Sequence, residues 1–211
     1  MNYQKELDKL LLNLEQTGGE TVPRLFLHSC CAPCSSYVLE YLRTYFDITV
    51  FYYNPNISFE EEYGKRVEEQ KRLIEALNQE GVGHLIRVEE GDYDPDCFYR
   101  MAKGLEACPE GGERCFRCFD LRLRETAKRA TQGGFDYFAT TLTISPLKNA
   151  EKLNEIGQAL ASEYQILWLP SDFKKRNGYK RSIELSDIYG LYRQDYCGCA
   201  YSKAERERQK T

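Results

Sequence analysis

The chain has 211 residues, of which 42% are hydrophobic and 29% are charged, and its formal net charge is -4 at pH 7. This length and composition suit a compact globular protein with a substantial core, and the negative charge argues against indiscriminate nucleic-acid binding. No run of about eighteen apolar residues is present, and residues 1–20 lack the basic start of a signal peptide. We therefore expect a cytoplasmic protein with no membrane association.

Apolar runs alternate with amphipathic patterns along the chain, beginning with a helix expected within residues 1–20. The expected strands are 24–28, 48–53, 84–88, 137–141 and 166–169. The expected helices are 34–46, 59–78, 93–104, 118–131, 150–163 and 183–189, and a basic tail is expected over 203–211. Strands that alternate with helices pair in parallel through crossover connections. We predict a single Rossmann-like, three-layer α/β domain over residues 1–211, with a mostly parallel sheet.

Nine cysteines are many for a chain expected in the cytosol. The cytosol keeps most thiols reduced, and an odd number does not suit a disulfide framework, so clustered cysteines favour metal or redox chemistry. Cys97 and Cys108 stand alone, and for these two we predict the ordinary role of a small buried hydrophobe.

The stretch HSCCAPCSS, residues 28–36, puts three cysteines directly after the first expected strand. In a parallel sheet, binding sites form in the loops at the carboxyl ends of the strands. A helix follows, and the N–H groups at its N-terminus favour the thiolate form of a nearby cysteine. Cys30 and Cys31 are therefore predicted to be chemically active. Cys34, one turn into the helix, could ligate a metal or pack against the strand.

Two further cysteine pairs complete the pattern. Cys115 and Cys118 form a CxxC, and with Cys30 and Cys31 they supply four thiolates, the complement of a [4Fe-4S] cluster or of a zinc site. Adjacent cysteines are awkward for zinc knuckles, which favours iron-sulfur. The CGC at 197–199 could form a strained, easily reduced disulfide, or it could hold a metal near the cluster.

Five motifs occur in order between about Leu25 and Ser202. They are HSCCAPCSS, FYYNPNI with EEY and Arg66 after it, RCFRCFDLRL, TTLTISPLKN and YRQDYCGCAYS. Together they resemble the iron-sulfur epoxyqueuosine reductases, the cobalamin-independent QueH type. The resemblance implies an oxidoreductase that removes the epoxide oxygen of epoxyqueuosine in a tRNA anticodon loop by a two-electron reduction, the last step of queuosine biosynthesis.

The resemblance also implies roles for the cysteines. It implies a [4Fe-4S] cluster on four ligands: Cys30, Cys31, Cys115 and Cys118. Cys197 and Cys199 would be the catalytic, redox-active pair, able to form a disulfide. An additional iron ion would lie beside the cluster, near Cys197, Cys199 and Cys34. The external electron donor stays open.

Contacts to a tRNA are expected from aromatic and basic side chains. A base that leaves its stack is commonly held by aromatic rings, and the candidates are Tyr52, Tyr53, Tyr189 and Tyr192. Candidates for backbone contacts are the basic residues Lys174, Lys175, Arg176, Lys180 and Arg181, and those beside the CxxC: Arg114, Arg117, Arg122 and Arg124. Asp120 and Tyr196 are candidate proton donors or supporting groups because they lie near the cysteines in sequence.

Two functions of other classes compete with this interpretation. A tRNA-thiolating or nucleotide-binding enzyme could use a related scaffold of the PP-loop, or HUP, type. Such enzymes usually carry a Gly/Ser-rich phosphate loop after the first strand, where this chain has CCAPCSS. A zinc-stabilised tRNA-binding module without enzymatic activity is the other alternative.

Overall fold

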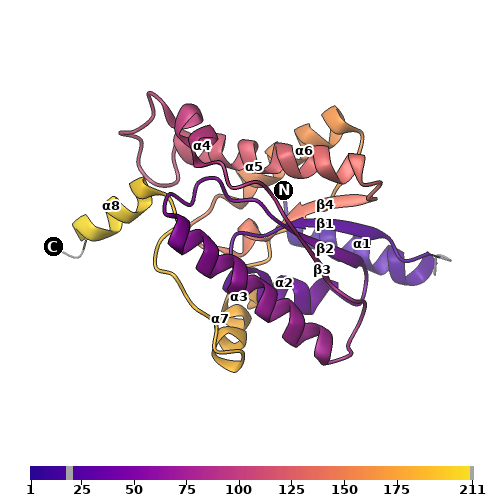
Figure 1. Cartoon of the computed structure of the whole chain (residues 1–211). Coiled ribbons are helices and arrows are strands. Elements are labelled where there is room, and N and C mark those ends of the chain that lie inside the picture. Colours follow the sequence, from indigo (N-terminus) through magenta and orange to yellow (C-terminus); the bar gives the residue numbers. More distant parts are fainter. Residues whose placement is uncertain (18–20, 210–211) are drawn as a thin grey trace.

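One five-stranded parallel sheet forms the centre of the computed structural model, which describes residues 1–17 and 21–209 (Figure 1). The strands are β1 Arg24–His28, β2 Asp47–Tyr52, β3 Arg87–Glu90, β4 Tyr137–Thr140 and β5 Leu167–Trp168. Their order is β3-β2-β1-β4-β5, and every neighbouring pair runs parallel. The predicted Rossmann-like α/β fold is confirmed.

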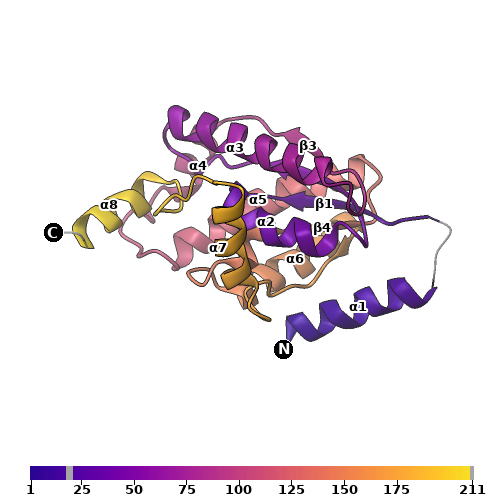
Figure 2. The same cartoon turned by 90° about the horizontal axis from the view of Figure 1, so that it is seen from below.

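Helices cover both faces of the sheet (Figures 1 and 2). They are α1 Tyr3–Thr17, α2 Ala32–Leu42, α3 Glu60–Gln79, α4 Pro95–Ala102, α5 Glu113–Gln132, η1 Thr141–Ile144, α6 Ala150–Tyr164, α7 Gly178–Ile188 and α8 Ala200–Gln209. Side chains alternate along β1: Leu25 and Leu27 pack with α1, α2 and α3, whereas Phe26 packs with α5 and α6. Burial on both faces explains why the central strands β1 and β2 carry continuous apolar runs rather than an alternating pattern. Within the described ranges, no helix has the length and apolar character needed to cross a membrane.

Most predicted elements lie where expected, and the largest shifts have local causes. Strand β3 begins at Arg87, three residues late, because the Asn78 side chain at the end of α3 makes hydrogen bonds of 2.9 Å with both the N–H and the C=O of Ile86. Helices α5 and α7 each begin five residues earlier than predicted, in polar first turns. The expected basic tail forms helix α8 up to Gln209, and residues 18–20 and 210–211 lie outside the described part of the chain.

The order of the sheet places the site. Strand β1 lies between β2 and β4, so the chain leaves the carboxyl ends of β1 and β4 in different directions: into α2 after β1 and into η1 after β4. Such a switch point opens a crevice between the two loops. The HSCCAPCSS stretch follows β1, and the TTLTISPLKN stretch spans the end of β4 and the turn beyond η1.

Asn154 on α6 holds the loop after β5 through hydrogen bonds. Removal of this side chain should destabilise the fold. Its Nδ2 donates to the carbonyls of Ala150 and Ser171, and its Oδ1 accepts from Trp168 Nε1 and the Ser171 N–H, all at 2.7–3.0 Å. Because Asn154→Ala leaves several of these buried groups unpaired, we expect the free energy of unfolding to fall by about 3 kcal/mol in urea titrations. Gln158→Ala, on the exposed face of the same helix, should change it by less than about 0.5 kcal/mol. Equal effects would contradict the role assigned to Asn154.

Candidate metal centre and active-site cleft

Three thiols converge at the end of β1. The sulfur atoms of Cys30, Cys31 and Cys34 all lie within 4.8 Å of one another, and those of Cys30 and Cys31 are 3.7 Å apart. Cys31 is the N-cap residue of α2, and Cys34 lies in its first turn. The Cys30 thiol donates a hydrogen bond that lowers the pKa of Cys31 well below its usual range. A single tetrahedral ion with bonds of about 2.3 Å holds its thiolates a little under 4 Å apart, so this group can hold a metal.

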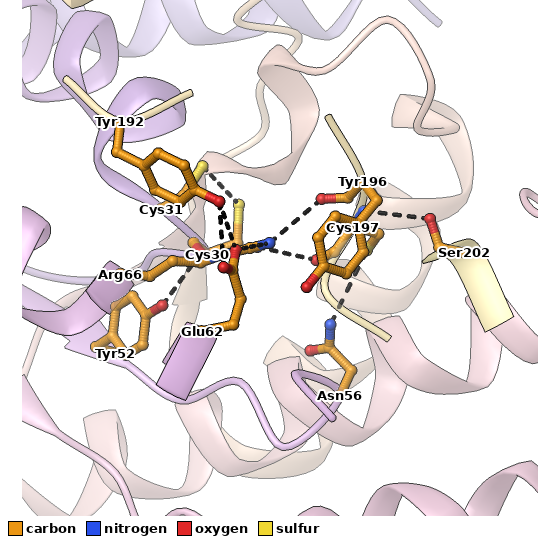
Figure 3. Close-up of polar contacts among 10 residues, drawn as sticks. All are labelled: Cys30, Cys31, Tyr52, Asn56, Glu62, Arg66, Tyr192, Tyr196, Cys197 and Ser202. Carbon is orange, nitrogen blue, oxygen red and sulfur yellow. Dashed lines mark hydrogen bonds and ion pairs between the residues drawn. The ribbon is translucent and has the colours of Figure 1, made fainter. Parts of the chain in front are cut away.

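The Asn54-Pro55-Asn56 turn after β2 connects the cysteine segments. Asn54 Nδ2 donates to the Ser29 carbonyl at 2.8 Å, and its Oδ1 accepts from Arg122 Nη1 of α5 at 3.5 Å. Asn56 Nδ2 lies 3.9 Å from Cys197 Sγ (Figure 3). The turn therefore contacts the segments that carry all three cysteine groups.

Cys115 and Cys118 lie in the first two turns of α5. The Gly111 N–H donates to Cys115 Sγ at 3.2 Å, while Arg122, one turn further along, donates from Nε to the Cys118 carbonyl. Cys118 is buried, and burial raises its pKa to about 11. A metal that binds here must displace the thiol protons, because only thiolate ligates.

Arg66 of α3 holds the loop that carries Cys197 and Cys199. It is 2% exposed, pairs with Glu62 at 2.7 Å, and donates to the carbonyls of Tyr196 and Cys197 at 3.4 and 3.2 Å (Figure 3). Gly198, between the cysteines, has φ +117°, and a Cβ there would lie 2.8 Å from Ile57 Cγ1, so glycine is required. The sulfurs of Cys197 and Cys199 have different neighbours. Cys199 Sγ accepts from the Ser202 N–H at 3.3 Å, whereas Cys197 Sγ faces Asn56 Nδ2.

A cleft of about 270 Å³ opens beside these thiols, close to the size of small ligand pockets. Cys30, Cys34 and Cys197 line it, and so do Tyr179 and Tyr196. A second, smaller cavity is lined by Cys115, Cys118, Cys197 and Cys199. Cys197 lines both cavities, so members of all three cysteine groups line two neighbouring cavities that share part of their walls.

Buried positive charge faces the thiols. Arg122 is 1% exposed, and it forms no ion pair with any carboxylate of the described chain. Its Nη2 atom is buried without a hydrogen-bond partner. Lys148 Nζ lies 3.5 Å from Cys197 Sγ. Buried cations need a counter-charge, and a thiolate-ligated metal group supplies one. The donor set and this unpaired charge therefore fit an iron-sulfur cluster or a related metal group.

Comparison with known proteins agrees with this geometry. The family model described as epoxyqueuosine reductase QueH matches residues 25–205. The chain belongs to the epoxyqueuosine reductase QueH family. It is 44% identical over 204 residues to the epoxyqueuosine reductase QueH of Staphylococcus epidermidis, covering 96% of this chain and 84% of that protein. The QueH proteins of Streptococcus pyogenes serotype M1 and Staphylococcus aureus are 44% and 42% identical, covering 96% and 98% of this chain and 78% and 85% of theirs.

Of the four predicted cluster ligands, Cys30 and Cys31 converge with Cys34, while Cys115 and Cys118 line the smaller cavity, and several other predicted contacts lie away from the cleft. Tyr52 is fully buried, and its hydroxyl donates to the Cys30 carbonyl at 3.4 Å, so it cannot stack on a base. Tyr53, Tyr189 and Tyr192 do not line the cleft either. Asp120 pairs with Arg124 at 3.3 Å outside the thiol region, whereas Tyr196 lines the cleft and stays a candidate.

The basic residues singled out in the sequence are largely neutralised or buried. In the 174–181 segment, ion pairs of 2.5–2.7 Å join Lys174 to Asp172, Arg176 to Asp8 and Arg181 to Glu40. Beside the CxxC, Arg114 and Arg122 are buried, and Arg117 and Arg124 pair with acidic residues of their own helix. Most of these basic side chains are engaged within the fold. Fewer of them are therefore free to contact a tRNA phosphate backbone.

Proposed function

We propose that this chain reduces epoxyqueuosine to queuosine in tRNA. The observation that carries the proposal is the meeting of three cysteine groups beside a ligand-sized cleft, in a chain of the QueH family. The cleft lies at the carboxyl edge of the parallel sheet, the usual binding position of this fold.

We further propose a [4Fe-4S] cluster held by Cys30, Cys31, Cys115 and Cys118, with an additional iron ion near Cys34, Cys197 and Cys199. The unpaired Arg122 charge and the gathered thiols support both assignments. When bound, an iron-sulfur group supplies electrons one at a time, at a potential that its surroundings set.

The protein's own residues would hold the reacting parts in place. Arg66 and Asn56 position Cys197 in the wall of the cleft. Cys197 and Cys199 would act as the redox-active pair, exchanging two electrons as they pass between dithiol and disulfide. His28 supports the end of β1, two residues before Cys30: burial lowers its pKa to about 3, so the ring stays neutral between Thr140 and the Tyr53 carbonyl.

The substrate would be the anticodon loop of a tRNA, with the modified base turned into the cleft. Tyr179 and Tyr196, which line the cleft, replace the four tyrosines predicted from sequence as candidates for stacking. Arg193 and Arg206, which also line it, are the candidates for contacts to phosphate.

Replacing Cys118 by alanine tests the cluster and the function together. We expect anaerobically purified Cys118→Ala to lose its iron, sulfide and visible absorbance and to reduce epoxyqueuosine-tRNA at least a hundredfold more slowly, because one of four thiolates is gone. Cys108→Ala, a cysteine outside both cavities, should keep the metal and the rate. A colourless Cys118→Ala protein that stays active would refute the cluster assignment. Zinc without sulfide in the unmodified protein would favour the tRNA-binding module.

A further inference from the structure

Lys148 lies at the boundary between the cleft and the smaller, thiol-lined cavity. It ends the turn after η1, where its N–H donates to the Ser145 carbonyl at 3.2 Å. Four residues line both the cleft and the smaller thiol-lined cavity: Glu110, Leu147, Lys148 and Cys197. Lys148 is the one cation among them. A molecule in the cleft beside Cys197 would therefore also contact the ammonium group of Lys148.

The ammonium group of Lys148 has donor capacity that the protein leaves unused. An ammonium has three N–H donors. The described chain gives Nζ one hydrogen bond, to Cys197 Sγ at 3.5 Å, and no carboxylate within ion-pair distance. Lys152, four residues further on, instead pairs with Glu155 at 3.0 Å. Lys148 thus keeps N–H groups for a ligand in the cleft.

The sheet explains why this lysine lines the same cleft as Cys30 and Cys34, which are more than one hundred positions away in sequence. Cys30 follows β1 and Lys148 follows β4 and η1, and β1 and β4 are adjacent at the switch point. Cys197 reaches the same place because Arg66 and Asn56 hold its loop. The position of Lys148 is therefore set by rigid elements, as a group that must be aligned with a reacting atom requires.

We propose that Lys148 donates a hydrogen bond to the epoxide oxygen and stabilises the negative charge that develops on it as the first carbon–oxygen bond breaks. This role rests on the proposed function. In the complete reaction both carbon–oxygen bonds break, two electrons from an external low-potential donor form the carbon–carbon double bond, and the oxygen leaves as water with two protons taken from solvent. Lys148 stays protonated throughout. Its contribution is electrostatic, like that of a donor in an oxyanion hole.

A competing role is that Lys148 only balances the charge of the thiolates. Both roles predict slower turnover without the lysine, so turnover alone does not separate them. Charge balance would act on the metal group, changing its content or its reduction potential. A hydrogen bond to the epoxide would act on the chemical step and leave both unchanged.

The test compares Lys148→Met and Lys148→Arg with the unmodified protein, in single turnovers of epoxyqueuosine-tRNA after chemical reduction with dithionite. For Lys148→Met we expect a rate at least a hundredfold lower, the size of effect for one lost oxyanion donor. The Kd for tRNA should stay within threefold, and the iron content, visible spectrum and midpoint potential should not change. Lys148→Arg should recover the rate to within about tenfold, and Lys152→Met, a matched change outside both cavities, should be neutral.

Three results would overturn the inference. The first is a Lys148→Met rate within threefold of the unmodified protein. The second is a rate loss that follows a shifted midpoint potential. The third is loss of iron from Lys148→Met and also from a second variant, Lys148→Gln, since the lysine would then serve the metal group. Failure of the proposed function is distinct, because the unmodified, iron-loaded protein would then convert no epoxyqueuosine at all.

Discussion

Replacing Arg66 by lysine should slow the reduction of epoxyqueuosine-tRNA about a hundredfold while the protein stays folded and keeps its metal. The guanidinium of Arg66 reaches Glu62 and the carbonyls of Tyr196 and Cys197 at once (Figure 3). A lysine keeps the charge near Cys31 but lacks the planar fork that joins three acceptors. The Cys197 loop would then lose its fixed position, and displacement by about 1 Å can cost a hundredfold in rate.

Arg72 provides a matched control on the same helix. It pairs with Glu69 at 2.8 Å and donates to the carbonyls of Tyr189 and Gly190, the same pattern as Arg66 but away from the cysteines. Arg72→Lys should change the rate by less than about threefold. In metal-free protein, Cys197 should be alkylated faster in Arg66→Lys than in Arg72→Lys, because its loop is released. Equal rates of alkylation and of turnover in the two variants would show that Arg66 does not position the Cys197 loop.

The fold could be predicted from the sequence because its signals are local. Strands β1, β2 and β4 are short apolar runs, and the CC, CxxC and CxC groups are visible as spacings. The predicted bounds of β3 differ from the observed ones because its residues are exposed at the sheet edge and lack an apolar pattern. Hydrophobic periodicity finds buried elements best, so a polar edge strand is its weakest case.

The remaining parts of the site depend on contacts between distant segments. Lys148, Asn54 and Asn56 are polar loop residues whose roles appear only once the order of the strands brings β1, β2 and β4 together. Ion pairs with distant acids likewise reduce the free charge of the basic segment at 174–181, in which Lys175 and Lys180 stay exposed. The acids that neutralise Arg176 and Arg181 are Asp8 and Glu40, which lie 168 and 141 positions away in the chain. Charge counted along the sequence does not reveal such pairs.

Replacing Arg122 by methionine should have two opposite effects. It should stabilise the metal-free protein and should weaken the retention of metal. Its guanidinium is buried against Cys118 and Asn54 with one nitrogen unpartnered and no carboxylate partner among the described residues. Without metal, the buried Cys118 is a neutral thiol at pH 7, since burial raises its pKa to about 11. Little then offsets the desolvation of Arg122, so we expect Arg122→Met to raise the free energy of unfolding of the metal-free, reduced protein by about 1 to 3 kcal/mol.

The same substitution should lower the iron and sulfide retained after reconstitution, because ligated thiolates lose the cation that balances their charge. Urea unfolding of metal-free protein and iron content after desalting measure the two effects separately. Arg124→Met removes a half-buried, ion-paired arginine of the same helix and should leave both within error. A metal-free Arg122→Met protein less stable than the parent would mean that the hydrogen bonds of Arg122 to Asn54 and to the Cys118 carbonyl outweigh its desolvation. Its buried charge would then be no sign of an anionic metal group.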